Sequence, residues 1–386
     1  MEPGTMSVTG DLAIVGTGFV ADLYMKSLQT FPGLRVRAVY DRDPDRLAAF
    51  CAHWSVPAAE SLAALLAGGG PDEVVLNLTN PGSHYAVSRQ ALEAGRHVYS
   101  EKPLAVDMDD ARALHALAAE RGRLLASAPC SVLGETCQTA WRALREDRIG
   151  TPLLVYAELD DGFISQAPYQ HWISASGAPW PHEDEFLVGC TLEHAGYYLT
   201  WLIAMFGPVR TVVAASAELD RAKLGGKPTA PDLSVGMLFF DEGVAARLTC
   251  SIIARHDHGL RIFGRTGTLE VEECWDNSAP VRIRPRRRIR RRLVEWPFAR
   301  PVRLTGETHP KVPRTGAAAM NFALGPAEML AAIAEGRPCR LSADFALHLN
   351  EVTLALQDAG QSAGAVQMTT EPGPIAPMDW AEGGFR

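Results

Sequence analysis

A glycine-rich turn near the N-terminus has the residue types and the setting of a dinucleotide site. Gly16-Thr17-Gly18-Phe19-Val20-Ala21 directly follows the apolar run Leu12 to Val15 and precedes a helical pattern. Glycines at such a turn let the backbone approach a pyrophosphate, whose charge then lies at a helix N-terminus. Two glycines alone also fit an ordinary tight turn, so the strand before them and the helix after them support the prediction. We expect the cofactor to contact Gly16, Gly18, Phe19 and Val20.

The next component of this pattern is an acid at the end of the following predicted strand. Asp41 follows Leu34 to Tyr40, about 25 residues after the glycine turn. A carboxylate there accepts hydrogen bonds from the adenosine ribose 2′-hydroxyl and repels a 2′-phosphate, which favours NAD. The neighbouring Arg42 could instead receive that phosphate, so NADP stays open as the cofactor.

Two more polar clusters lie where predicted strands end, after Glu73 to Leu78 and after Arg96 to Ser100. Ligands of a parallel sheet bind beyond the carboxyl ends of its strands, so we expect these residues to border the cofactor. They are Thr79, Asn80, His84, Glu101 and Lys102. The Lys102 ammonium could stabilise negative charge on a reacting oxygen and lower the pKa of a neighbouring acid. A surface lysine before a strand-ending proline is the plainer alternative.

An aromatic-rich stretch in the second half has side chains that suit a sugar or a cyclitol. Flat rings stack on the C–H faces of such molecules, and carboxylates and histidines hydrogen-bond their hydroxyls. The candidate substrate contacts are Tyr169, Trp172, Trp180, His182, Glu185 and His194. The same stretch could be a loop that packs over a sheet edge. The spacing of His182, Glu185 and His194 matches no standard zinc pattern, so we expect no metal.

The elements that must position the first of these groups alternate along the chain. Predicted strands and helices succeed one another from Leu12 to Ala126, ending with helix Met108 to Arg121 and strand Arg123 to Ala126. Such alternation builds a doubly wound parallel sheet, which is the Rossmann type of α/β domain. We therefore expect a dinucleotide-binding domain over residues 1–128.

The rest of the chain has a different pattern. Strand-like runs cluster between residues 153 and 272, a helix follows Gly189, and two late helices are predicted over Ala317 to Glu335 and Asp344 to Gly360. Strands that cluster apart from helices favour an α+β domain with one open sheet face. We expect a substrate-binding and oligomerisation domain over residues 129–386. The open face suggests a homodimer or a homotetramer.

The order of the motifs resembles that of the Gfo/Idh/MocA oxidoreductases. Thr79-Asn80-Pro81-x-x-His84, Ala94-Gly95-Arg96-His97-Val98 and Glu101-Lys102-Pro103 follow one another at that family's intervals, and the similarity spans residues 11 to 128. The resemblance implies a Rossmann domain and a second domain with an open, mostly antiparallel sheet. It also implies hydride transfer between a nicotinamide and a sugar-like or cyclic alcohol.

The resemblance further implies a proton-transferring residue within Gly189 to Tyr198, where this chain departs from the family pattern Leu-x-Asp-x-Gly-x-His. Matching the glycines and the leucine puts His194 at the aspartate position and Tyr198 at the histidine position. Tyr198 is then the general acid/base, assisted by Lys102, and His194 orients the substrate or relays a proton. In the alternative register His194 itself takes the proton, which suits a side chain that titrates near neutral pH. Both residues could also be core residues of an apolar helix.

The composition excludes several classes of protein. The 386 residues are 47% hydrophobic and 21% charged with a net charge of −8, which is unlike a general nucleic-acid or acidic-membrane binder. Seven cysteines without Cys-x-x-Cys spacing favour a reducing compartment. No apolar run reaches the roughly 18 to 20 residues of a membrane span, and the N-terminus lacks a signal-peptide pattern. We expect a cytoplasmic protein.

Two further polar clusters allow more than one interpretation. Eight arginines lie between Arg282 and Arg292 and could bind a phosphorylated ligand. Because they alternate with apolar residues, a strand edge guarded by charge is the favoured interpretation. His256-Asp257-His258 could line the far side of a pocket, although a solvated turn is favoured there.

Together these features predict an NAD(P)-dependent dehydrogenase or reductase for a secondary alcohol on a sugar, amino sugar or cyclitol. Neither nucleic acid nor a membrane is expected as a partner. Two alternatives stay open. One is a non-catalytic NAD(P)-binding sensor of the same fold, because the Asp-x-Gly-x-His pattern is missing. The other is a reductase of an imine, an aldehyde or a dihydrodiol.

Overall fold

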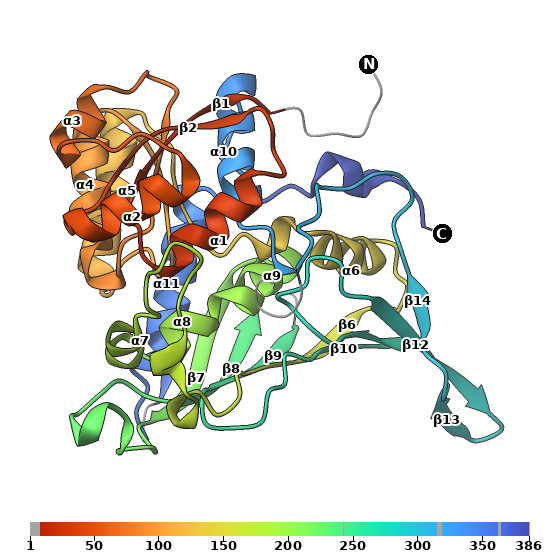
Figure 1. Ribbon diagram of the computed structural model, residues 1–386. Coiled ribbons are helices and arrows are strands. Elements are labelled where there is room, and N and C mark those ends of the chain that lie inside the picture. The colour runs from red at the N-terminus through yellow and green to blue at the C-terminus, as the bar shows by residue number, and fades with distance from the viewer. Residues whose placement is uncertain (1–7, 242, 315–318, 362–363, 386) are drawn as a thin grey trace.

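The computed structural model describes residues 8–241, 243–314, 319–361 and 364–385, which form two sheets and the helices around them (Figure 1). The first sheet has five parallel strands in the order β2-β1-β3-β4-β5. They are β1 (Gly10–Val15), β2 (Leu34–Tyr40), β3 (Val74–Asn77), β4 (His97–Ser100) and β5 (Leu125–Ser127). The strand order reverses between β1 and β3, and ligands of such sheets bind beyond the strand ends at that point.

The alternation along β1 explains why helices cover both faces of this sheet. Leu12 and Ile14 pack into one core cluster, whereas Ala13 and Val15 pack into another, since successive side chains of a strand point to opposite faces. On the first face lie α1 (Phe19–Leu28) and α2 (Pro44–Trp54). On the second face lie α3 (Leu62–Ala67), α4 (His84–Glu93) and α5 (Met108–Arg121). The predicted doubly wound Rossmann domain is confirmed.

The second sheet has ten strands in the order β13-β12-β11-β10-β6-β9-β8-β7-β15, with β14 paired to β12. Its long strands are β6 (Pro152–Asp160), β7 (Val209–Ala217), β8 (Leu233–Phe240), β9 (Ala245–Ser251) and β12 (Val281–Ile289). Its short strands are β10 (Leu260–Gly264), β11 (Gly267–Val271), β13 (Arg292–Glu295), β14 (Arg300–Val302) and β15 (Ala365–Gln367). Among the described strands β6 and β9 pair in parallel and the other neighbours are antiparallel, as expected for this domain.

Helices cover one face of the second sheet and leave the other open (Figure 1). The covering helices are α6 (Glu135–Arg145), α8 (Cys190–His194), α9 (Gly196–Phe206) and α11 (Ala343–Gln357), with α7 (His182–Val188) beside them. The burial along β8 alternates accordingly: Leu238 and Phe240 are buried, whereas Val235 and Phe239 are 38% and 43% exposed. On β8 the open face therefore presents apolar side chains.

Two C-terminal helices return to the first sheet. In α10 (Leu324–Glu335), a Cβ on Gly325 would lie 2.3 Å from the Tyr99 hydroxyl oxygen, so the missing side chain lets this helix approach β4. In α11, Leu347 belongs to the same core cluster as Val98, and Asn350 Oδ1 accepts the Ala105 N–H at 3.2 Å. The chain beyond residue 128 thus also completes the core of the Rossmann sheet.

Three elements differ from the sequence predictions. The helix after Gly189 is interrupted at Ala195, which separates α8 from α9. The first late helix begins at Leu324 because Asn321 forms a turn in which its side chain accepts the Ala323 N–H, and the predicted residues 317 and 318 lie outside the described residues. Strands β13, β14 and β15 were not separately predicted, because each is short, mostly exposed and without apolar alternation.

Candidate active site

A cleft of about 580 Å³ opens beside the carboxyl ends of β1, β2 and β3. Its lining includes the predicted cofactor residues Gly16, Gly18, Asp41, Arg42, Thr79 and Asn80. Gly16 has a φ of +97°, and a Cβ there would lie 2.6 Å from the Leu78 carbonyl oxygen, so the turn requires glycine. Gly18 is the N-cap of α1, and Phe19 and Val20 form that helix's first turn. This cradle before a helix N-terminus fits the pyrophosphate of a dinucleotide.

The Asp41 carboxylate is held at the edge of the cleft by its own neighbours. Its Oδ2 accepts the Thr17 N–H at 2.7 Å and the Thr17 hydroxyl at 2.8 Å, and its Oδ1 accepts the Asp43 N–H at 2.9 Å. Arg42 and Arg46 line the same cleft. A carboxylate that favours NAD and two guanidinium groups that could receive a 2′-phosphate therefore lie side by side.

The structure places His84 behind the cleft rather than in it, which corrects its expected role as a cofactor contact. The residue is fully buried, its Nδ1 lies 2.7 Å from the Pro103 carbonyl oxygen, and its Nε2 lies 2.8 Å from the Thr79 carbonyl oxygen. Burial lowers the pKa of this imidazole. His84 thus joins the two strand-end loops that border the cofactor cleft and fixes their spacing.

Glu101 likewise contacts the protein rather than the cleft. Its Oε1 accepts the Tyr24 hydroxyl at 2.7 Å and its Oε2 accepts the Lys102 N–H at 3.0 Å, and the residue is 6% exposed. Each carboxylate oxygen therefore accepts a hydrogen bond from the protein. Glu101 holds the backbone of Lys102, and its contact with the cofactor stays a prediction.

Lys102 forms a buried ion pair with Glu193 on α8. The Lys102 ammonium donates to Glu193 Oε2, and the two side chains are 20% and 4% exposed. Burial opposes the charge on Lys102, but Glu193 and the carboxylates around it raise the lysine pKa well above its ordinary value. Glu193 was not singled out from the sequence. Its position in the sequence could have pointed to it, because Glu193 is the acidic residue directly before His194 in the motif.

A third carboxyl group, that of Glu185 on α7, completes this cluster. Burial and the neighbouring Glu193 raise the pKa of Glu185 well above its usual range. Burial would also raise the pKa of Glu193, but Lys102 and a hydrogen bond from Glu185 bring it below its usual value. The pKa values of the two carboxyl groups are therefore displaced in opposite directions beside one ammonium.

The two residues predicted to handle the proton have different environments. His194 Nδ1 lies 3.0 Å from the Cys190 carbonyl oxygen, and its Nε2 lies 3.3 Å from Asp161 Oδ2. Tyr198 is fully buried, its hydroxyl donates to the His258 carbonyl oxygen, and burial raises its pKa well above the ordinary value. The structure thus places Tyr198 in the core. Burial also raises the pKa of Tyr197, but the charge of Lys102 opposes that rise, so Tyr197 lies close enough to Lys102 to be affected by it.

Trp275 is the centre of an aromatic cluster beside these groups, and no sequence motif pointed to it. Its ring centroid lies 5.5 Å from that of Tyr197, 6.0 Å from that of His194 and 4.3 Å from that of His258. His256 and His258, for which a solvated turn was favoured, therefore border the candidate site. His258 is buried, whereas His256 is half exposed.

The predicted aromatic substrate contacts pack mainly on one another. Tyr169 lies 5.0 Å from His182 and 5.9 Å from Trp180, and Trp180 lies 5.1 Å from Trp172, measured between ring centroids. The segment is tied to the Rossmann domain, because the Ser176 hydroxyl donates to Asp22 at 2.7 Å and the Asn80 amide donates to Asp184 at 2.5 Å. It forms a loop that reaches the border of the cofactor cleft.

The sequence matches two models of one protein family. Residues 11–128 match the Gfo/Idh/MocA oxidoreductase domain with an NAD-binding Rossmann fold, and residues 137–270 match the Gfo/Idh/MocA C-terminal domain. The chain belongs to the Gfo/Idh/MocA oxidoreductase family. The resemblance inferred from the motifs is thereby confirmed, and residues 11–128, which include the cleft beside Gly16, form an NAD-binding Rossmann domain.

Two curated proteins with similar sequences are dehydrogenases. The D-apiose dehydrogenase of Paraburkholderia graminis is 25% identical over 268 residues, which are 67% of this chain and 66% of that enzyme. The trans-1,2-dihydrobenzene-1,2-diol dehydrogenase of Sus scrofa is 25% identical over 265 residues, covering 68% of this chain and 74% of that enzyme. This chain therefore matches just under two thirds of the first relative's length.

A solved family structure has the same fold. The WlbA dehydrogenase from Bordetella pertussis, in complex with NADH and UDP-GlcNAcA, superimposes with a TM-score of 0.71 at 20% identity, covering 95% of this chain and 99% of that one. Among the described residues of this Gfo/Idh/MocA protein, we find no helix that is both long and apolar enough to span a membrane.

Proposed function

We propose that this protein transfers a hydride between NAD(P) and a secondary alcohol or ketone of a sugar, an amino sugar or a cyclitol. The observation that carries the proposal is the buried Lys102–Glu193 ion pair at the end of β4. Burying two charges costs several kcal/mol per ion, and such a pair is poor evidence of a stabilising role. Buried groups with displaced pKa values are typical of catalytic sites.

In the proposed reaction each side chain of the pair has one task. A bound nicotinamide supplies or accepts the hydride. Lys102 Nζ donates a hydrogen bond to the substrate oxygen and stabilises the negative charge that the oxygen carries when its proton leaves during oxidation, or when the hydride adds to the carbonyl carbon during reduction. The hydroxyl proton passes to an acceptor next to Lys102. Glu193, which is paired with Lys102, and His194, which faces Asp161, are the two candidates for this acceptor. Tyr198 has no part, since its hydroxyl is bonded to the His258 carbonyl.

The experiment that tests the proposal combines binding and turnover. Nicotinamide fluorescence during titration with NADH and NADPH reports cofactor binding without a guess about the substrate. A panel of sugars, cyclitols and dihydrodiols then reports turnover. We expect Lys102→Met to slow turnover by about 100- to 1000-fold, which is the usual cost of one lost donor to a developing oxyanion, with cofactor affinity nearly unchanged. Failure to bind either dinucleotide, or full turnover by Lys102→Met, contradicts the proposal.

A sensor without turnover is the alternative from another class. Any substrate-dependent change in NAD(P)H absorbance excludes it. The dihydrodiol dehydrogenase relative at 25% identity is the reason for including dihydrodiols in the panel. If only a dihydrodiol or an aldehyde is turned over, the sugar part of the proposal fails while the hydride transfer stands.

We also propose that two copies associate through the open face of the second sheet. Directly opposed pairs on β7 and β8 present Val213 with Met237 and Ala215 with Val235 on that face, and Phe239 lies beside them. An apolar patch across neighbouring strands is typical of an interface between subunits.

The cytoplasm suits this chain because its seven cysteines are free and six of them are buried. Sedimentation and cell fractionation check these two points.

A further inference from the structure

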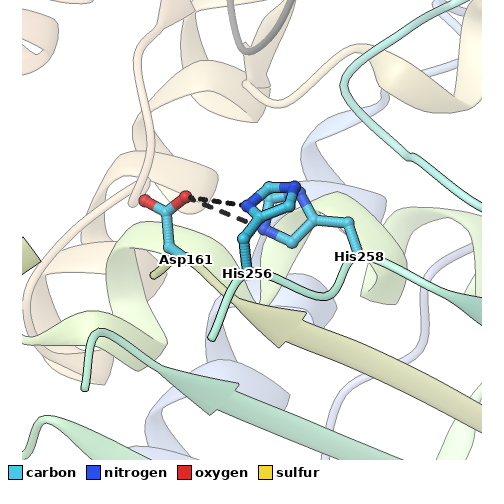
Figure 2. Close-up of side chains that lie close together, drawn as sticks. All are labelled: Asp161, His256 and His258. Carbon is cyan, nitrogen blue, oxygen red and sulfur yellow. Dashed lines mark ion pairs between the residues drawn. The ribbon is translucent and has the colours of Figure 1, made fainter. Parts of the chain in front are cut away.

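Beside the candidate active site, Asp161 and two histidines face one another across a small gap (Figure 2). Asp161 directly follows β6, and His256 and His258 lie in the segment between β9 and β10. One ligand atom from each lies within 4.8 Å of the other two. Asp161 Oδ1 is 3.9 Å from His256 Nδ1 and 3.8 Å from His258 Nε2. These separations are too long for direct hydrogen bonds.

In each imidazole, the ring nitrogen that is not beside Asp161 contacts the carboxylate of Glu273. His258 Nδ1 lies 2.9 Å from Glu273 Oε1, and His256 Nε2 lies 3.1 Å from Glu273 Oε2. A carboxylate can only accept, so these two nitrogens carry the protons. The inner nitrogens, His258 Nε2 and His256 Nδ1, then present lone pairs toward the Asp161 carboxylate. A carboxylate that orients a histidine from behind is the usual outer shell of a metal site.

The gap between the three groups lacks a donor. His258 Nε2 is buried and has no hydrogen-bond partner among the described residues, and its side chain is 0% exposed. A buried polar atom without a partner is unfavourable, and nitrogen lone pairs that face a carboxylate are repelled by its negative charge. A cation in the gap satisfies all three groups at once.

We propose that Asp161, His256 and His258 bind a divalent transition-metal ion such as Zn²⁺, with Glu273 orienting both histidines. Two imidazoles and one carboxylate suit zinc and similar metals, whereas Ca²⁺ and Mg²⁺ take oxygen ligands. Ligands about 2.1 Å from a tetrahedral ion lie about 3.4 Å apart, so closing the present 3.8 and 3.9 Å separations takes shifts of a few tenths of an ångström.

Three protein ligands leave a coordination position for a water or for an oxygen atom of a bound molecule. The half-exposed His256 gives an ion access from solvent. The other Asp161 oxygen lies 3.3 Å from His194 Nε2, so the ion and the candidate proton acceptor share one carboxylate. The metal site does not rest on the proposed function, because it is defined by residues other than Lys102 and Glu193.

The test uses the full chain, stripped with a chelator and then titrated with Zn²⁺ by calorimetry and with Co²⁺ by visible absorption. We expect one ion per chain and, with Co²⁺, bands in the visible range that report nitrogen and oxygen ligation. Asp161→Asn and His256→Ala should each weaken binding at least 100-fold. Glu273→Gln should weaken it about 10- to 100-fold, as loss of an outer-shell partner does.

The matched control is His115→Ala, which removes an exposed histidine that lies 2.6 Å from Asp344, far from the cluster. This variant should bind the metal like the wild type. Circular dichroism and NADH fluorescence show whether each variant is folded, and NADH binding should survive in His256→Ala. Absence of stoichiometric uptake by the wild type overturns the proposal, and so does binding that Asp161→Asn and His256→Ala leave unchanged. Failure of turnover with intact metal binding affects the proposed function alone.

Discussion

The surroundings of the Tyr198 hydroxyl differ from those expected of a proton-transferring residue. Matching the motif put this phenol at a catalytic position, but its hydroxyl bonds to the His258 carbonyl oxygen inside the core. That carbonyl belongs to the segment that carries both histidines of the proposed metal site. Tyr198 therefore supports the active-site wall from behind.

Tyr198→Phe tests this assignment. The variant leaves a buried carbonyl without its donor, so we expect the free energy of unfolding to fall by about 1 to 3 kcal/mol while turnover changes by less than about twofold. Urea denaturation and steady-state kinetics measure the two effects. Tyr85→Phe, on the outer part of α4, is the control and should change neither. If turnover instead fell by two orders of magnitude with stability unchanged, Tyr198 would return to the proton-transfer step.

His348 on α11 makes stability depend on pH. Its Nε2 accepts the Val209 N–H at 3.0 Å, and burial lowers its pKa to about 4. The unfolded chain has a histidine pKa of about 6.5, so between pH 6.5 and 4 the unfolded state binds more protons and stability falls as the pH is lowered.

His348→Gln should remove this residue's contribution to the change of the unfolding free energy with pH, which is at most about 1.4 kcal/mol per pH unit. The measurement is the urea unfolding free energy at pH 5 and at pH 7 for the wild type and the variant. Because His97 and His309 are lowered in the same direction, part of the slope remains. His115→Gln on the surface is the control. An equal pH dependence in wild type and His348→Gln contradicts the assignment.

The residues with a local signal could be predicted, and those placed by tertiary packing could not. Gly16 and Asp41 are defined by a turn and a strand end that the sequence itself encodes. Glu193 meets Lys102 only after the two domains pack together, and Trp275 meets His194 only after distant segments of the second domain do. His84 and Glu101 belonged to recognisable motifs, but only the folded chain shows that their polar atoms contact the protein.

At the scale of elements, the loop between β6 and α8 is the part that links the two domains beside the cofactor. Ser176 donates to Asp22 on α1, and the same carboxylate accepts the Trp54 indole N–H at 2.7 Å. This small network holds the loop against the helix whose N-terminus borders the cleft. Loss of one bond should loosen the loop without changing the glycine turn.

We expect Ser176→Ala to speed dissociation of NADH about 3- to 10-fold, because such a change corresponds to about 0.6 to 1.4 kcal/mol, the usual net contribution of one hydrogen bond. Stopped-flow fluorescence measures this rate. Ser278→Ala, on an exposed turn of the second domain, is the control. An unchanged rate means that the loop does not restrain the cofactor.

The arginine-rich segment between Arg282 and Arg292 forms strand β12 and the start of the outer hairpin. Arg282 and Arg284 on β12 pair with Glu272 and Glu270, and Arg288 to Glu295 form the outer hairpin of the sheet (Figure 1). The interpretation as a charged strand edge is wrong for Arg282 and Ile283, because β12 pairs there with β11 on one side and with β14 on the other. Its partner strand β13 escaped prediction because its four residues are exposed and give no alternating pattern.

At the scale of the whole molecule, the open sheet face predicts the state of assembly. Phe239→Asp places a charge in the centre of the apolar patch on β8, where burial in an interface would cost several kcal/mol. We expect the wild type to sediment as a dimer or tetramer and the variant as a monomer that still binds NADH. Leu293→Asp, on the outer hairpin, should leave the assembly unchanged. A monomeric wild type contradicts the proposed association.

The return of α10 and α11 to the first sheet has a consequence during synthesis on the ribosome. The strands of the Rossmann sheet emerge first, but the surfaces that meet Gly325 and Leu347 stay uncovered until the last helices have been made. Apolar surface left open for that time is what chaperones bind and what aggregates form from. The Rossmann domain of a nascent chain therefore cannot complete its core before α10 and α11 have been synthesised. The two domains must reach the native state together.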